Sequence, residues 1–116
     1  MKADVTVKEN YEFRRIYRKG KSAVSPTLVL YCQKNRRGRT RLGITVSTKL
    51  GGAVVRNRIR RRLREIWRLN RPSLQEGWDV ILVARGRAVR ADYRRLNADY
   101  LRLLKTAGLF RQEETE

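Results

Sequence analysis

Arginine side chains dominate one short stretch of this chain, and the guanidinium group is the chemistry that the sequence offers most densely. Residues 56–64 read RNRIRRRLR, and a further arginine, Arg68, follows about one helical turn later. A planar guanidinium forms paired hydrogen bonds with phosphate and stacks on bases, which an ammonium group does less well. The stretch therefore predicts an anionic partner, and RNA or DNA fits it better than a generic anion.

At helical spacing, the polar and apolar residues of this stretch separate onto opposite faces. The outer row is Asn57, Arg61, Arg64 and Arg68. The expected buried stripe is Val55, Ile59, Leu63, Ile66 and Trp67. Arginines four residues apart repel by about 0.2–0.5 kcal/mol per pair, whereas each buried apolar side chain contributes about 1.5–3 kcal/mol. The fold tolerates this charge without benefiting from it, so we expect the benefit in binding. A solvated face is the alternative, but only Glu65 relieves the repulsion here.

The composition supports a binding role and argues against a self-contained enzyme. The chain has 116 residues, 29 of them Lys or Arg against 11 Asp or Glu, and a formal charge of +18. It contains no histidine, the usual general base near neutral pH, and its one cysteine, Cys32, lies in an apparent strand as a buried thiol. The carboxylates show no metal-ligand spacing, so no metal site is expected.

The apolar runs of the chain are far shorter than the roughly 20 residues that a membrane helix needs. The N-terminus lacks the apolar core and cleavage site of a secretory signal. We therefore expect a cytoplasmic protein with no membrane partner.

The pattern of elements predicts one α+β domain over residues 1–111 and a disordered acidic tail at 112–116. Thr6 and Glu9 have capping-box spacing for a first helix that Gly20 ends, and residues 21–24 favour an edge strand. Residues 28–31 favour a strand, 35–38 a hairpin turn, and 41–47 an alternating strand with one buried face. A helix over 53–70, a central strand over 79–85 and a helix from Asp92 through Lys105, with Gly108 as terminator, complete the order α-β-β-β-α-β-α.

Two features of the sequence, the aromatic residues and a glycine pair, each allow two explanations. Phe13, Tyr17 and Tyr31 could stack on unpaired bases, although their spacing alone favours core packing. The Gly51-Gly52 pair before the arginine stretch either lets a ligand approach the backbone closely or simply breaks the loop.

The residues around the arginine stretch resemble the signature of the bacterial ribonuclease P protein subunits. The resemblance covers RLGITVS at 41–47, Lys49, and residues 51–65 with Arg56-Asn57-Arg58. It extends to residues 13–20, Tyr31 and residues 79–85, whereas Thr48, Gly52 and the pair at 86–87 depart from the usual residues. The family fold is a ribosomal protein S5 domain 2-like sandwich of the same order, with a mixed four-stranded sheet and a left-handed βαβ crossover, against the general right-handed rule.

That resemblance implies a non-catalytic protein subunit whose partners are the ribonuclease P RNA and precursor tRNA. In the family the RNA removes the 5′ leader of precursor tRNA through Mg²⁺ ions that it holds itself, and the protein broadens the substrate range and lowers the Mg²⁺ requirement. No small-molecule cofactor and no catalytic residue of the chain are then expected, which would explain a nuclease subunit without histidine.

The resemblance also implies two sets of site residues. Contacts with the catalytic RNA are expected from Arg56, Asn57, Arg58, Arg60, Arg61 and Arg64, with Arg68 added from the outer row. The cleft for the single-stranded leader is expected to involve Phe13, Tyr17, Tyr31 and Lys49. This reverses the preference for core packing of the three aromatic residues. The competing hypotheses are a structural ribosomal protein and, far less favoured, a histidine-free nuclease that acts alone.

Overall fold

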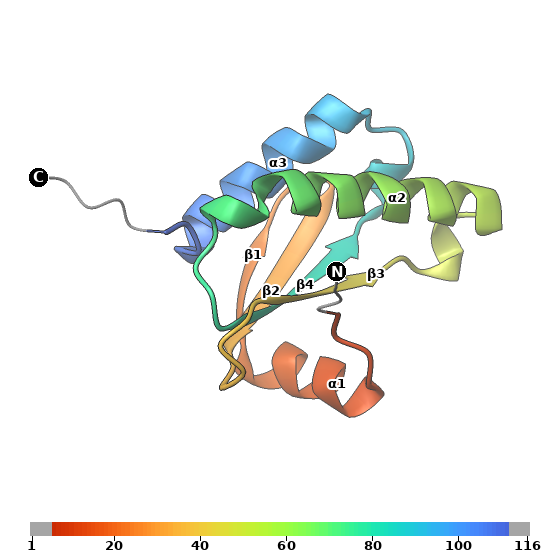
Figure 1. Cartoon of the computed structure of the whole chain (residues 1–116). Helices are drawn as coiled ribbons and strands as arrows, with labels where there is room; N and C mark the ends of the chain where they lie inside the picture. The colour runs from red at the N-terminus through yellow and green to blue at the C-terminus, as the bar shows by residue number, and fades with distance from the viewer. Residues whose placement is uncertain (1–5, 112–116) are drawn as a thin grey trace, which may run out of the picture.

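The α+β order predicted from the sequence is confirmed in the computed structural model, which describes residues 6–111; the predicted tail at 112–116 lies outside the described residues. The main elements are α1 (Asn10–Lys19), β1 (Lys21–Val24), β2 (Leu28–Lys34), β3 (Arg41–Thr45), α2 (Ala53–Asn70), β4 (Trp78–Ala84) and α3 (Tyr93–Ala107). Short 3-10 segments η1 (Thr48–Leu50), η2 (Arg71–Ser73) and η3 (Gly86–Val89) lie between them. The sheet has α1 on one face and α2 with α3 on the other (Figure 1).

The sheet is mixed, and its strand order is β1-β2-β4-β3. β2 is antiparallel to both β1 and β4, whereas β3 is parallel to β4. The prediction of a hairpin turn at 35–38 is wrong, because β4 lies between β2 and β3 and the two strands do not pair. Asn35 shapes this loop by accepting a hydrogen bond from the backbone N–H of Arg37 at 2.9 Å. α2 crosses over from β3 to β4, and the left-handed sense of that crossover stays a prediction.

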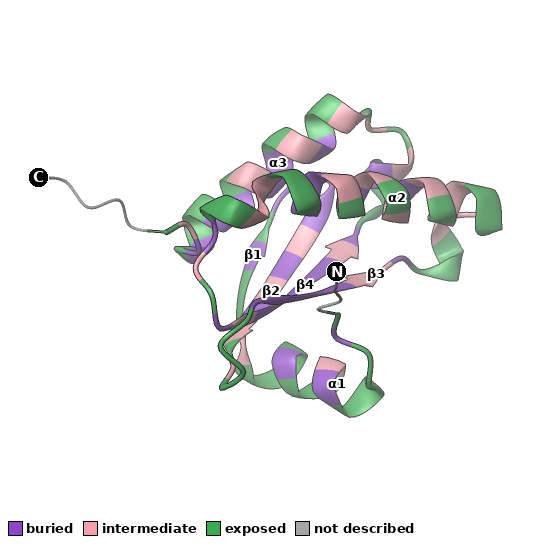
Figure 2. Ribbon diagram, in the orientation of Figure 1, coloured by how far each residue is buried: buried purple, intermediate pink, exposed green. Residues whose placement is uncertain are grey.

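The main core lies between the sheet and the two helices α2 and α3 (Figure 2). The fully buried side chains that α2 and α3 contribute include Ile59, Leu63, Ile66, Leu96 and Leu104. Val55, which the spacing places in the buried stripe, is only half-buried because it lies in the first turn of α2, at the margin of the core. A smaller core of Val7, Ile16 and Ile81 lies under α1 on the opposite face.

The strand at 41–45 is buried on both faces, so the prediction of one buried face is wrong. Arg41 and Gly43 point away from the main core, yet they are buried because α1 covers that side. α1 is short, and it leaves the other end of the same face open. The face therefore changes along the sheet from a covered region to an accessible one.

Local capping explains most helix ends. The Thr6 cap is wrong: Thr6 forms a parallel bridge with Leu42 in the sheet, and α1 begins at Asn10 with a capping box between Glu9 and Glu12. α3 begins as predicted, where the Asp92 carboxylate accepts the backbone N–H of Arg95 at 2.8 Å. It ends at Gly108, whose φ of +73° is the left-handed conformation that glycine adopts readily.

Candidate RNA interface

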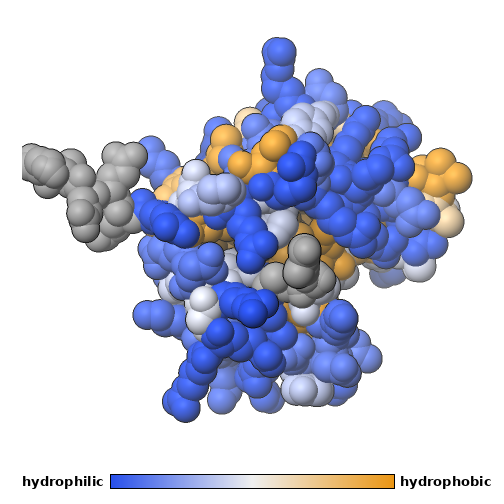
Figure 3. Space-filling view, viewed as in Figure 1, coloured by the Kyte–Doolittle hydropathy of each residue, from blue (hydrophilic) through white to orange (hydrophobic). Residues whose placement is uncertain are grey.

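The outer face of α2 carries the row that the spacing predicts. The four α2 side chains Asn57, Arg61, Arg64 and Arg68 are all exposed, whereas the apolar residues between them are buried against the sheet. Hydrophilic side chains dominate the surface over α2 (Figure 3). The helix therefore presents guanidinium groups to solvent on the side opposite its core contacts.

The arginines of α2 do not all face a partner molecule. Arg58 donates to the carbonyl of Val89 at 3.3 Å, and Arg62 donates to the carbonyl of Ala91 at 3.1 Å. Both side chains thus fasten α2 to the segment between β4 and α3. Arg56 similarly donates to the carbonyl of Gly51 at 3.1 Å, just before the helix. These half-buried arginines serve the fold, and periodicity alone did not separate them from the exposed row.

Within residues 6–111, Arg61 and Arg64 have no hydrogen-bond or ion-pair partner, so their donors are available to a ligand. Arg68 differs because its guanidinium contacts the Glu65 carboxylate at 2.7 Å. That hydrogen bond lowers the pKa of Glu65 below its ordinary value and keeps the acid charged. Arg60 donates to the Asn57 side chain at 3.3 Å. Of the exposed row on α2, Arg61 and Arg64 therefore keep the guanidinium donors that are least engaged within residues 6–111, and their contact with RNA stays a prediction.

The three aromatic residues come together at the open end of the other face, although they belong to α1 and β2. The ring centroids of Tyr17 and Tyr31 are 4.8 Å apart at an interplanar angle of 76°, and those of Phe13 and Tyr17 are 6.2 Å apart. The Tyr17 hydroxyl lies 3.1 Å from Oγ1 of Thr45 on β3. Tyr17 is 37% exposed, so one ring of this cluster is available for stacking.

The core-packing explanation is partly right for these aromatic residues, and base stacking stays a prediction. Phe13 and Tyr31 pack against the small core under α1, while their remaining surface stays accessible. A hollow of about 420 Å³ beside them is lined by Asn10, Phe13, Arg14, Tyr17 and Thr45. Aromatic rings with a basic side chain at the rim are suited to an unpaired nucleotide strand. We call this region the aromatic cleft.

Gly43 has a steric role in the aromatic cleft that the sequence did not reveal. A Cβ atom at this position would lie 2.8 Å from Cζ of Phe13, which is closer than real Cβ contacts. Glycine therefore lets the Phe13 ring approach the backbone of β3 closely. Gly51 is explained by its backbone, since its φ of +148° disfavours any side chain, and this supports the loop-breaking explanation for that residue.

A buried ion-pair network fixes α1 to the sheet and was missed in the sequence. Arg41 on β3 donates to both carboxylate oxygens of Asp79 at 2.8 Å and to Glu12 on α1 at 3.1 Å. Burial acts to raise the pKa values of both carboxyls. The hydrogen bonds and charge of Arg41, together with one further hydrogen bond to each carboxyl and the charge of Arg37, outweigh it, so each pKa lies below its ordinary value. The network thus holds three charges under α1 and sets the distance of Phe13 and Tyr17 from the sheet.

Lys49 lies in η1, four residues after Thr45, and its side chain is exposed. Its segment connects the strand that borders the aromatic cleft to the start of α2. The structure thus places it between the two predicted binding regions.

Residues 6–111 contain no cluster of three or more His, Cys, Asp or Glu side chains that could hold a metal ion. In the same part of the chain, no helix combines the length and the apolar character that crossing a membrane requires. Cys32 is buried as predicted, and burial raises the pKa of its thiol.

Comparisons with known proteins point to one family. The family model described as "Ribonuclease P" matches residues 1–108. The ribonuclease P protein component of Natranaerobius thermophilus is 42% identical over 108 residues, covering 93% of this chain and 94% of the relative. That of Clostridium novyi is 41% identical over 112 residues, covering 95% and 99%.

Solved structures match as well. The RNase P protein of Staphylococcus aureus superposes with a TM-score of 0.85 at 34% identity, covering 94% of this chain and 100% of that one. The RNase P protein of Thermotoga maritima superposes with a TM-score of 0.80 at 31% identity, covering 87% and 96%. The resemblance thus extends from short motifs to nearly the whole fold.

Proposed function

This chain belongs to the bacterial ribonuclease P protein family, and from that membership we propose how its two surfaces divide the work of the enzyme. It is a protein subunit of ribonuclease P, the endoribonuclease that removes the 5′ leader from precursor tRNA. The family match explains the positive charge of the chain better than the two competing hypotheses do, which were a structural ribosomal protein and a nuclease that acts alone. The enzyme's RNA is accordingly its partner.

We assign the catalytic RNA to the outer face of α2. The observation that carries this assignment is that Arg61 and Arg64 are exposed and unpaired within residues 6–111 while the helix buries its apolar stripe. Arg68, Asn57 and Arg60 extend the same face. Arg56 donates to the Gly51 carbonyl through Nε, and Arg58 donates to the Val89 carbonyl through Nη2. Each of them contacts the RNA only with the donors that these hydrogen bonds leave over.

We assign the single-stranded leader of precursor tRNA to the aromatic cleft. The rings of Tyr17 and Tyr31 lie edge to face with their centroids 4.8 Å apart. Phe13 packs beside them against the small core under α1. Stacking contributes about 1–3 kcal/mol per base and tolerates any base, which suits leaders of varied sequence. Lys49 adds a positive charge where the leader passes from the cleft toward α2.

The hydrolysis itself belongs to Mg²⁺ ions that the partner RNA holds, and the protein lowers the concentration of Mg²⁺ that the RNA needs. A chain with a formal charge of +18 replaces part of the counterion atmosphere where phosphates converge. It thereby widens the range of precursor tRNAs that are processed at low Mg²⁺.

Reconstitution tests this division. The cognate ribonuclease P RNA and a precursor tRNA are mixed at low Mg²⁺ with and without the chain, and cleavage is followed over time. We expect the chain to accelerate leader removal strongly and to cleave nothing alone. Undiminished processing without the chain would refute the proposal.

The α2 assignment is tested by the salt dependence of binding to the RNA. An Arg61→Ala/Arg64→Ala variant should flatten the slope of log K against log salt by about 0.7–0.9 per lost phosphate contact. The matched control is Arg102→Ala/Lys105→Ala, which removes two exposed charges from α3. Equal slopes for the two variants would show that α2 provides only general charge.

A further inference from the structure

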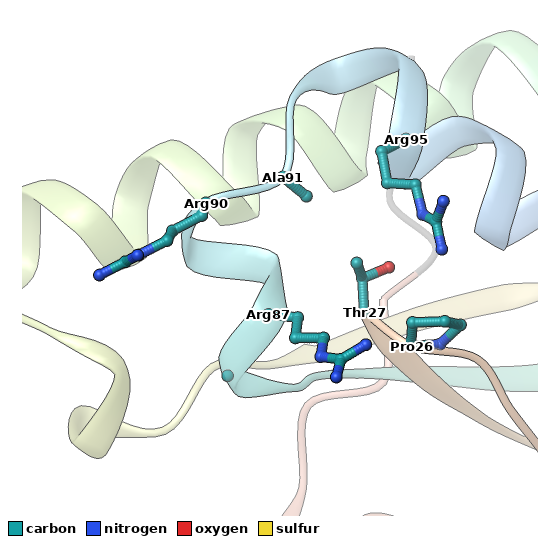
Figure 4. A pocket seen from close by; sticks show the side chains of 7 residues that line it. Pro26, Thr27, Arg87, Arg90, Ala91 and Arg95 are labelled. Carbon is teal, nitrogen blue, oxygen red and sulfur yellow. The ribbon is translucent and has the colours of Figure 1, made fainter.

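A pocket of about 500 Å³ opens where the β1–β2 turn, η3 and the start of α3 meet. It lies outside both the outer face of α2 and the aromatic cleft. Three of its seven lining residues are the arginines Arg87, Arg90 and Arg95, and the other four are uncharged. Figure 4 shows the guanidinium ends of Arg87 and Arg95 near Thr27 and Pro26, whereas Arg90 points away on the other side.

The walls of this corner pocket are held by hydrogen bonds to buried groups. The backbone N–H and hydroxyl of Thr27 donate to one oxygen of Asp99 at 3.3 and 2.6 Å, and Asp99 is only 2% exposed. The other Asp99 oxygen lies 3.4 Å from Nε of Arg95. Arg85 donates to the carbonyl of Ser25 at 2.8 Å and holds the β1–β2 turn against the end of β4. Arg95 is therefore oriented before any ligand arrives.

Arg87 supplies the charge that is not matched. Its side chain is exposed, and within residues 6–111 it has no hydrogen-bond or ion-pair partner. Asp99 offsets only Arg95, so the pocket keeps a net positive charge. The guanidinium groups of Arg87 and Arg95 suit a group with several acceptor oxygens and one negative charge, which describes a phosphodiester.

The corner pocket lies between α2 and the edge strand β1. Arg58 and Arg62 fasten its η3–α3 wall to α2 through the carbonyls of Val89 and Ala91. On the other side, Arg87 also lines a second hollow of about 470 Å³ that reaches Val24 on the exposed edge strand β1. Positive charge therefore continues from α2 around the end of the sheet where β4 finishes.

We propose that Arg87 and Arg95 bind a backbone phosphate of RNA in the corner pocket, as a third contact of the chain in its enzyme. The proposal rests on the proposed function, because it takes the RNAs of ribonuclease P as the ligands. It adds a site that neither the arginine spacing nor the aromatic cluster indicates. Asp99 acts here as a positioning residue, since it touches Arg95 and not the phosphate.

The test compares Arg87→Ala in η3 with Arg102→Ala, which removes one exposed charge of α3 beyond Arg95. Affinity for the cognate ribonuclease P RNA is titrated at several salt concentrations, and affinity of the assembled enzyme for precursor tRNA is titrated separately. Arg87→Ala should flatten the salt slope by about 0.7–0.9 and weaken binding roughly five- to eightfold near 0.1 M salt in one of the two titrations. The affected titration identifies which RNA supplies the phosphate.

Arg87→Lys should restore the salt slope, because a lysine keeps the charge. Equal effects of Arg87→Ala and Arg102→Ala, or no effect of Arg87→Ala in either titration, would overturn the proposal. The Arg61→Ala/Arg64→Ala variant is run in parallel. A loss of RNA binding there without any loss in Arg87→Ala would refute the corner pocket and leave the proposed function standing.

Discussion

Replacing Arg41 by methionine should destabilise the chain by about 3–5 kcal/mol at neutral pH, the cost typical of removing one partner from a buried ion pair. The guanidinium donates to Asp79 at 2.8 Å and to Glu12 at 3.1 Å. Those carboxylates are only 1% and 4% exposed, so the variant leaves two buried negative charges with few remaining donors. Methionine keeps a similar volume, which limits the contribution of a cavity.

The effect of Arg41→Met should shrink as the pH falls. In the wild-type chain the pKa values of Glu12 and Asp79 lie below their ordinary values. The stability from this network is thus fully present above the ordinary carboxyl pKa of about 4 and is lost as the pH falls through the lower folded values. In the variant, burial without Arg41 raises both pKa values, so its carboxyls take up protons at higher pH and the penalty declines.

Urea unfolding at pH 7 and at pH 4, followed by tryptophan fluorescence, measures both effects. The control is Arg37→Met, which removes an ion pair with the same Glu12 at 3.3 Å from a side chain that is 56% exposed. That change should cost at most about 1 kcal/mol. A loss below about 1 kcal/mol for Arg41→Met, or a loss that does not change with pH, would refute the reasoning.

Three other changes address the cleft and the core. Tyr31→Ala should weaken binding of precursor tRNA with a long leader by about 1–3 kcal/mol and spare a leaderless tRNA, and equal losses in the two titrations would contradict a role in stacking. Gly43→Ala should displace the Phe13 ring, since the new Cβ would lie 2.8 Å from Cζ, and should weaken leader binding at unchanged affinity for the partner RNA. An unchanged leader affinity would contradict this steric role. Leu63→Ala, at a fully buried position, should cost about 2–5 kcal/mol in urea unfolding, and a loss below 1 kcal/mol would show that α2 packs loosely.

Local signals in the sequence were enough for the helices on the main core. The bounds of α2 and its exposed row follow from apolar spacing, and the ends of α3 follow from the Asp92 cap and Gly108. Such features depend on residues within a turn or two of each other, which is the range over which periodicity is informative. The candidate phosphate contacts Arg61 and Arg64 were predictable for the same reason.

Features that depend on distant partners were not predictable in this way. The loop at 35–38 looked like a hairpin because the strand that separates β2 from β3 comes 40 residues later in the chain. Arg41 looked solvent-facing in an alternating strand, since its partners Glu12 and Asp79 lie 29 and 38 residues away. The grouping of Phe13 with Tyr31 required the family resemblance, because spacing alone favoured packing.

The interior position of β4 has a consequence for synthesis of the chain on the ribosome. β2 and β3 emerge first, yet both wait for a neighbour that is complete only at residue 84, so only the β1–β2 hairpin can form early. α2 emerges during that wait, with its apolar stripe uncovered and its cationic side free to meet ribosomal RNA. Nascent fragments that stop before Trp78 would thus carry Arg61 and Arg64 without the sheet that orients them, and they would attract polyanions indiscriminately.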